Sequence, residues 1–126
     1  MSAAPVTTLI TKREGSILIV NFQDVSLIDE SRIESAGKEL IELTSGGVNE
    51  KIALNFQAVG FMSSAMISKV IDFGNACKGE KIKLRLCCIN DNVRKVFDLM
   101  RLEKVFAIDA DEETSMAKLA NQGWFG

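Results

Sequence analysis

The sequence predicts an α/β domain with a mixed, largely parallel sheet that is opened by a β-hairpin, and with about four helices packed mainly on one face. Segments with the two-residue period of strands alternate along the chain with segments of helical period. The first two strand-like segments have only a short turn between them, so they pair antiparallel, whereas helices separate the later strands, which therefore run parallel. Hydrophobic residues make up 47% of the 126 residues, enough for a core.

The opening hairpin is predicted from two neighbouring strand-like segments. Val6–Arg13 alternates in part between apolar and polar residues, and Ser16–Phe22 is rich in β-branched residues. Glu14 and Gly15 between them are a turn signal. The two strands therefore begin the sheet as an antiparallel pair.

The first helix is predicted to follow Asp24–Ile28, with Asp29 or Ser31 as its N-cap, because a side-chain oxygen can accept from the free N–H groups of a helix start. Apolar or small residues recur on one face at helical spacing: Ile33, Ala36, Gly37, Leu40, Ile41 and Thr44. The run Ser45-Gly46-Gly47 ends the helix.

The rest of the chain repeats the alternation of strand and helix, which gives the order ββαβαβαβα. The predicted elements are a strand Lys51–Phe56, a helix Ser63–Cys77, a strand Lys81–Ile89, a helix capped by Asn90 or Asp91, a strand Lys104–Ile108, and a helix capped by Asp109 or Asp111. No linker or repeat interrupts this order, so we expect one domain over 1–126, with a core of about 6–120 and a tail 121–126. Trp124 and Phe125 in that tail are expected to pack on the domain or on a partner, so that deleting 121–126 lowers thermal stability or partner affinity.

Composition argues against most catalytic classes. The chain has no histidine and no tyrosine, which excludes Ser-His-Asp and Cys-His hydrolytic sites and His-containing zinc sites. Cys77, Cys87 and Cys88 form no CxxC pair and are expected to be buried thiols. Neither nucleotide-binding glycine pattern is present. We therefore expect no enzyme activity, no metal and no cofactor.

Charge and hydropathy also limit the partners. Fifteen Lys and Arg against seventeen Asp and Glu give a net charge of −2, so no attraction to nucleic acid is expected. No stretch approaches the roughly 20 apolar residues of a membrane-spanning helix, and the N-terminus lacks the pattern of a signal peptide. A cytoplasmic protein without direct membrane insertion is expected.

The run Val59-Gly60-Phe61-Met62-Ser63-Ser64-Ala65-Met66-Ile67 and the order of elements resemble the STAS family, and in particular its anti-sigma-factor antagonists. The resemblance extends to Leu27-Ile28-Asp29-Glu30, Leu86–Asn90 and Arg101–Phe106. It implies a regulatory domain that binds an anti-sigma kinase or a related signalling protein. In that family an Asp-Ser-Ser-Gly-Leu-Gly-like run joins the third strand to the second helix, and its second serine is phosphorylated by the kinase.

This chain departs from the phosphorylated pattern. The family Asp is matched by Ser63, the first serine by Ser64, and the phosphorylated serine by Ala65, which has no hydroxyl. Asp29 matches a family acid close to the phosphorylation site. The phosphoacceptor candidates are therefore Ser64 and, failing it, Ser63, since a helix N-terminus favours a phosphate. The alternative is that both serines are helix caps.

The resemblance places the partner-binding surface at the second helix and the loop before it. The predicted contact residues are Asp29, Met62, Ser63, Ser64, Met66 and Lys69. Core packing is the alternative for at least one of the two methionines. Two other functions stay open: a STAS subunit of a larger scaffold or lipid-transport assembly, and, least favoured, a small enzyme. The sequence also leaves open a homo-oligomer.

Overall fold

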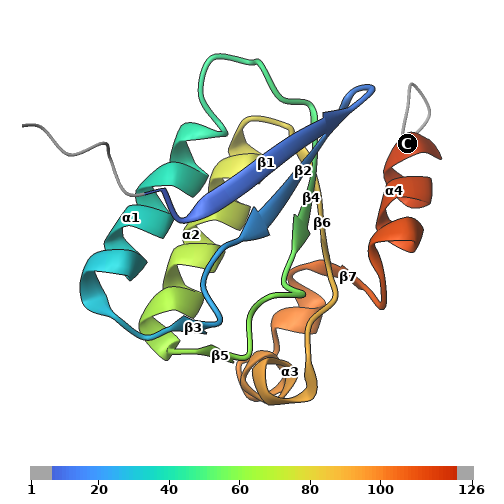
Figure 1. Cartoon of the computed structure of the whole chain (residues 1–126). Helices are drawn as coiled ribbons and strands as arrows, with labels where there is room; N and C mark the ends of the chain where they lie inside the picture. The colour runs from blue at the N-terminus through green and yellow to red at the C-terminus, as the bar shows by residue number, and fades with distance from the viewer. Residues whose placement is uncertain (1–6, 122–126) are drawn as a thin grey trace, which may run out of the picture.

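A five-stranded mixed sheet forms the centre of the computed structural model, which describes residues 7–121 (Figure 1). Its strand order is β1-β2-β4-β6-β7. The first pair is antiparallel and every later pair is parallel, as the sequence predicts. The strands are β1 (Leu9–Glu14), β2 (Ile17–Phe22), β4 (Lys51–Asn55), β6 (Lys83–Cys87) and β7 (Ala107–Asp109).

Four α-helices in the described residues cover this sheet. Figure 1 shows α1 and α2 side by side on one face, α3 at the lower end of the sheet, and α4 alone on the opposite face. Their bounds are α1 (Glu30–Glu42), α2 (Ser64–Gly79), α3 (Asp91–Leu99) and α4 (Glu112–Asn121), and a short 3-10 helix, η1 (Leu102–Lys104), follows α3. The fold class is thus the predicted one, with α4 as the one α-helix of residues 7–121 on the second face.

The core has two unequal parts because the sheet has two covered faces. On β2, Leu18, Val20 and Phe22 point into the larger part, which lies under α1, α2 and α3. Ile17 of the same strand points the other way and packs with Leu119 of α4. Alternate residues of a strand face opposite sides, so one strand supplies both layers.

The helix α4 is held to the sheet by a buried ionic cluster around Asp109, the last residue of β7. Arg85 Nε and Nη2 donate to the two Asp109 carboxylate oxygens at 2.7 and 3.0 Å. Ser115 Oγ of α4 donates to the same carboxylate at 2.6 Å, and Lys118 Nζ lies 3.3 Å away. These partners stabilise the ionised form and lower the pKa of Asp109, the bond from Arg85 having the largest effect.

Several predicted boundaries are corrected. The strand expected at Lys81–Ile89 is shorter, because Lys81 and Cys88 at its two ends have positive φ angles of 59° and 62°, outside the β region. The expected strand Lys104–Ile108 begins as η1 and becomes β7 only at Ala107. Ile41 is 40% exposed and so lies at the edge of the core face of α1.

A second, two-stranded parallel sheet was not predicted. It pairs β3 (Ser26–Leu27), in the approach to the first helix, with β5 (Phe61–Met62), in the loop before the second. Two-residue strands are too short to show a period in the sequence. The predicted packing of Trp124 and Phe125 lies outside the described residues.

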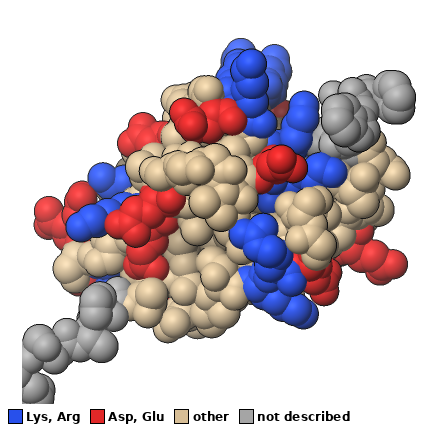
Figure 2. All heavy atoms as spheres, turned by 90° about the horizontal axis from the view of Figure 1, so that it is seen from above, with Lys and Arg blue, Asp and Glu red and all other residues tan. Residues whose placement is uncertain are grey.

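Charged side chains of both signs lie next to one another on the face seen in Figure 2, rather than in separate acidic and basic fields. No helix in the described residues is long and apolar enough to cross a membrane.

Candidate functional site

The two serines at the start of α2 have different roles. Ser63 is the N-cap: its backbone is extended (φ −74°, ψ 162°), and its Oγ accepts from the backbone N–H of Met66 at 3.2 Å. Ser64 is the first residue of the helix and is exposed. Its hydroxyl makes no hydrogen bond with residues 7–121. The capping alternative therefore describes Ser63, whereas the Ser64 hydroxyl is not used as a cap.

The small β3–β5 sheet brings the starts of α1 and α2 together. The carbonyl oxygen of Val25 accepts from the N–H groups of Gly60 and Phe61 at 2.7 and 3.1 Å, and that of Leu27 accepts from Ser63 at 3.1 Å. Each strand is followed within two residues by a helix N-cap. The resemblance implies that Asp29 lies close to the serine run. The pairing of β3 with β5 brings the two N-caps, Asp29 and Ser63, to the same end of the small sheet.

Asp29 is the N-cap of α1. Its carboxylate accepts from the backbone N–H of Arg32 at 3.1 Å and from Ser31 Oγ at 2.6 Å. These bonds lower the pKa of Asp29, the Ser31 hydroxyl having the largest effect, so the exposed side chain is ionised at neutral pH. Asp29 thus adds a fixed negative charge to the site.

Three large apolar side chains lie exposed in the segments that form the β3–β5 sheet. Val25 is 63% exposed, Ile28 65% and Phe61 58%. We call these three residues the apolar patch. An ideal Cβ built on Gly60 would lie 3.4 Å from Val25 Cγ1, so this residue lies directly over the loop that carries Phe61. The β3–β5 pairing brings the segments of these side chains together, and contiguous apolar surface left in water is typical of a protein-binding site.

Hydrogen bonds hold the segments that carry the apolar patch in place. The Asn90 side-chain amide donates to the carbonyl oxygens of Val59 and Gly60 at 3.0 and 3.2 Å, and its oxygen caps α3 by accepting from Val93. Asp24, just before β3, accepts from Arg32 Nε and Nη2 at 2.8 and 2.6 Å. The patch is therefore presented by a fixed backbone, which lowers the entropic cost of binding.

Both methionines of the predicted contact surface lie in the core. Met66 is fully buried and Met62 is 7% exposed. A residue two or three positions into a helix packs inward or outward according to the helix face, and Met66 lies on the same face as Val70 and Phe73. We correct the predicted surface by removing these two side chains.

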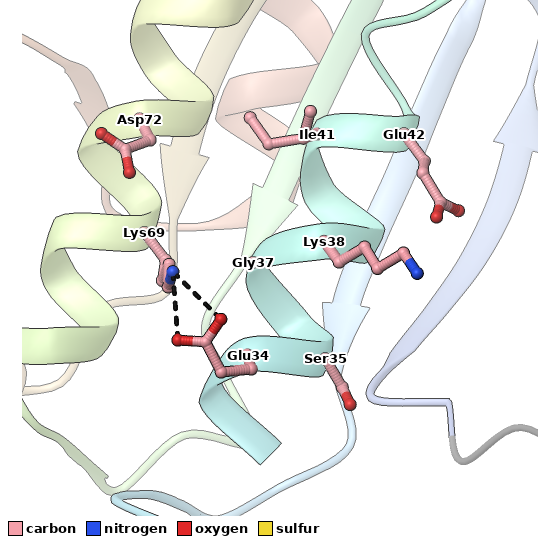
Figure 3. Close-up of a pocket in the computed structure, with 8 residues that line it drawn as sticks. All are labelled: Glu34, Ser35, Gly37, Lys38, Ile41, Glu42, Lys69 and Asp72. Atoms are coloured by element: carbon pink, nitrogen blue, oxygen red, sulfur yellow. Dashed lines mark hydrogen bonds and ion pairs between the residues drawn. The ribbon is translucent and has the colours of Figure 1, made fainter. Parts of the chain in front are cut away.

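Lys69 lies between α1 and α2 (Figure 3). Its stem passes over Gly37, where an added Cβ would come within 2.7 Å, and its Nζ lies 3.3 Å from Glu34 Oε1. The pair crosses one end of a groove of about 600 Å³ between the two helices, which Ile41 and Asp72 also line. Lys69 is thus a half-buried residue of α2 that faces α1.

Sequence reasoning missed the apolar patch. Val25 and Ile28 were part of the approach to the first helix, and Phe61 was part of a loop. The one available signal was the presence of large apolar residues in segments without helical or strand period, beside the serine run.

In the described residues no group of three or more His, Cys, Asp or Glu side chains could hold a metal ion. Burial raises the pKa of the Cys77 and Cys87 thiols to about 12, so both are protonated and poor nucleophiles at neutral pH. The arrangement of the surface suits contact with another molecule.

Comparisons with known proteins concern the family and the fold. The family model described as STAS domain matches residues 6–115. No curated protein sequence shows significant similarity to the chain. A STAS-domain anti-sigma-factor antagonist from Planctomyces limnophilus has a TM-score of 0.77 at 14% identity, covering 90% of this chain and 98% of that one.

Two further solved structures have the same fold. An anti-sigma factor antagonist from Mycobacterium paratuberculosis has a TM-score of 0.76 at 14% identity, covering 96% of this chain and all of the other. The anti-sigma factor antagonist SpoIIAA in its unphosphorylated form has a TM-score of 0.74 at 17% identity, with 91% and 98% covered. At these identities the likeness concerns the fold.

Proposed function

The chain belongs to the STAS domain family, and from this premise we propose that it is a non-enzymatic, cytoplasmic regulatory domain that works by binding a partner protein. The partner class is an anti-sigma kinase or a related signalling protein. The observation that carries the proposal is the apolar patch of Val25, Ile28 and Phe61 beside the start of α2. The names of its structural neighbours, anti-sigma factor antagonists, support the partner class.

The apolar patch supplies the binding energy. Each of its three side chains is more than half exposed in the free chain, and burying such a side chain in an interface contributes on the order of 1–2 kcal/mol. Asp29 adds an ionised carboxylate next to Ile28, which selects a partner with a complementary basic group. Met62, next to Phe61 in β5, is buried in the core and is not part of the proposed contact surface.

Ser64 provides the regulation. Its hydroxyl is exposed and free of hydrogen bonds to residues 7–121, whereas that of Ser63 is occupied by the cap. A phosphate here adds about −1.5 to −2 charge units at the start of a helix, where it is well tolerated in the free chain. In an apolar interface the same charge must lose its water, so phosphorylation of Ser64 weakens partner binding.

A second candidate function follows from Ala65. This residue is exposed at the position of the family's phosphorylated serine and has no hydroxyl. A domain without a phosphoswitch binds its partner constitutively, as a subunit of a scaffold or transport assembly. In that case Ser64 is unmodified and its charge state has no regulatory role.

A pull-down from the native host tests both functions. The baits are the wild type, Ile28→Asp/Phe61→Asp, Ser64→Asp, and the control Val48→Asp, which places one carboxylate on an apolar side chain that is 70% exposed after α1. We expect the wild type and Val48→Asp to capture one ATP-binding signalling protein, and the Ile28/Phe61 bait to lose it. Loss with Ser64→Asp supports the switch, and full retention supports the constitutive binder. Equal capture by the wild type and the Ile28/Phe61 bait contradicts the proposed surface.

A further inference from the structure

A second groove lies away from the apolar patch, between the C-terminal half of α2 and the segment that leads into β7. Its volume is about 400 Å³. Its lining residues include Gly74, Lys78, Ile82, Leu84, Lys104 and Phe106. We call it the edge groove, because β7 is the last strand of the sheet order on this side.

The edge groove lies at a step in the sheet edge. The pairing of β7 with β6 begins at Arg85 and covers only the second half of that strand. The backbone N–H of Lys83 donates to the carbonyl oxygen of Glu50 at 2.9 Å, and the carbonyl oxygen of Cys87 accepts from the backbone N–H of Phe56 at 3.0 Å. The odd-numbered residues of β6 therefore direct their backbone groups toward β4. Because the direction alternates, the N–H of Leu84 points to the outer edge. No strand lies beside it there in the described chain.

The floor of the edge groove is apolar and closely packed. An ideal Cβ on Gly74 would lie 2.4 Å from Phe106 Cε1, so the ring rests directly on the α2 backbone. Ile82 and Leu84 complete this floor, and Val105 at the rim is 63% exposed. A side chain that enters here meets hydrocarbon, next to a backbone donor at the sheet edge.

The charge of the edge groove selects the occupant. Lys78 on α2 and Lys104 on the opposite wall are its charged lining residues, and both are basic. A second copy docked across a two-fold axis would bring these lysines against themselves, which is unfavourable. An acidic occupant instead pairs with both walls.

We propose that the edge groove binds an extended, acidic segment of a partner protein, which continues the sheet edge next to the first half of β6. The backbone of that segment accepts from the Leu84 N–H, an apolar side chain packs on Phe106, and carboxylates on either side reach Lys78 and Lys104. This is strand addition to a sheet edge. It is independent of the contact made by the apolar patch.

A synthetic peptide tests the proposal. The probe alternates glutamate with valine, is blocked at both ends and carries a fluorophore; a matched probe has lysine in place of glutamate. We expect the acidic probe to bind the full chain more tightly, by fluorescence anisotropy, and Lys78→Glu/Lys104→Glu to weaken it about tenfold. Backbone amide shifts of the labelled chain are expected at Leu84 and Val105.

Charge reversal also provides the controls. Lys38→Glu/Lys95→Glu makes the same change in net charge at two exposed lysines that do not line the edge groove and is expected to leave acidic-probe affinity within twofold. Lys78→Glu/Lys104→Glu is expected to prefer the lysine probe, which separates lost recognition from lost folding. Equal affinity for the two probes, equal weakening by the control variant, or amide shifts confined to the apolar patch overturns the proposal.

Discussion

Replacing Asp109 by alanine tests how α4 is fixed to the sheet. The Asp109 side chain is 1% exposed and that of Arg85 14%, and the change removes two short hydrogen bonds between them. It also removes the acceptor of Ser115. What remains is a largely buried guanidinium without its counter-ion, a change that costs 3–5 kcal/mol in other proteins.

We expect Asp109→Ala to lower the free energy of unfolding by about 3 kcal/mol, the low end of that range, because Arg85 keeps some contact with water. The melting temperature then falls by roughly 10 °C. Urea unfolding followed by circular dichroism measures the difference. The matched control is Asp72→Ala, an exposed carboxylate without an ion pair in the described residues, which we expect to cost less than about 0.5 kcal/mol. Equal costs for the two variants would show that the Asp109–Arg85 pair does not hold α4 to the sheet.

Three further predictions concern pH, capping and packing. Because the pKa of Asp109 is lowered on folding, the ionised carboxylate stabilises the folded chain above about pH 4, and this stabilisation is lost as the pH falls further. The free energy of unfolding of Asp109→Asn should therefore depend less on pH in the acid range than that of the wild type, and parallel curves for the two proteins would argue against this role. Ser63→Ala should cost about 1 kcal/mol in urea unfolding through loss of the cap, and Ser64→Ala nearly nothing; equal losses would contradict the assignment. Gly74→Ala should destabilise by about 1–3 kcal/mol through its clash with Phe106, with partial recovery in Gly74→Ala/Phe106→Leu; an unchanged melting temperature for Gly74→Ala would show that the ring moves freely.

The main elements of the fold could be predicted because hydrophobic period and short-range capping signals determine them. Asp29 and Asn90 cap their helices as expected, since the accepting oxygen and the donating N–H lie three residues apart in sequence. The β3–β5 pair could not be predicted, because it joins Ser26 to Phe61 through backbone bonds that leave no side-chain pattern. No side-chain pattern marks the point where the predicted strand Lys104–Ile108 divides into the end of η1 and, from Ala107, β7.

The candidate site was predicted in part. Asp29 and Ser64 are exposed, as a contact surface requires, and their contact with a partner stays a prediction; Ser63 has the alternative role of a cap. Met62 and Met66 are buried because of the face of the strand or helix on which each lies. The serine run between them does not indicate which way these side chains point. The exposure of Phe61 depends on the same tertiary pairing and was equally hidden.

Photo-crosslinking at position 61 shows whether the apolar patch touches a partner protein. Phe61 is replaced by the photoreactive amino acid benzoylphenylalanine in the native host, and the same replacement at Val48 is the control, because both side chains are more than half exposed. Irradiation is expected to join position 61, but not position 48, to one larger ATP-binding signalling protein. No adduct at position 61, or the same adducts at both positions, would contradict a partner-binding surface at the apolar patch.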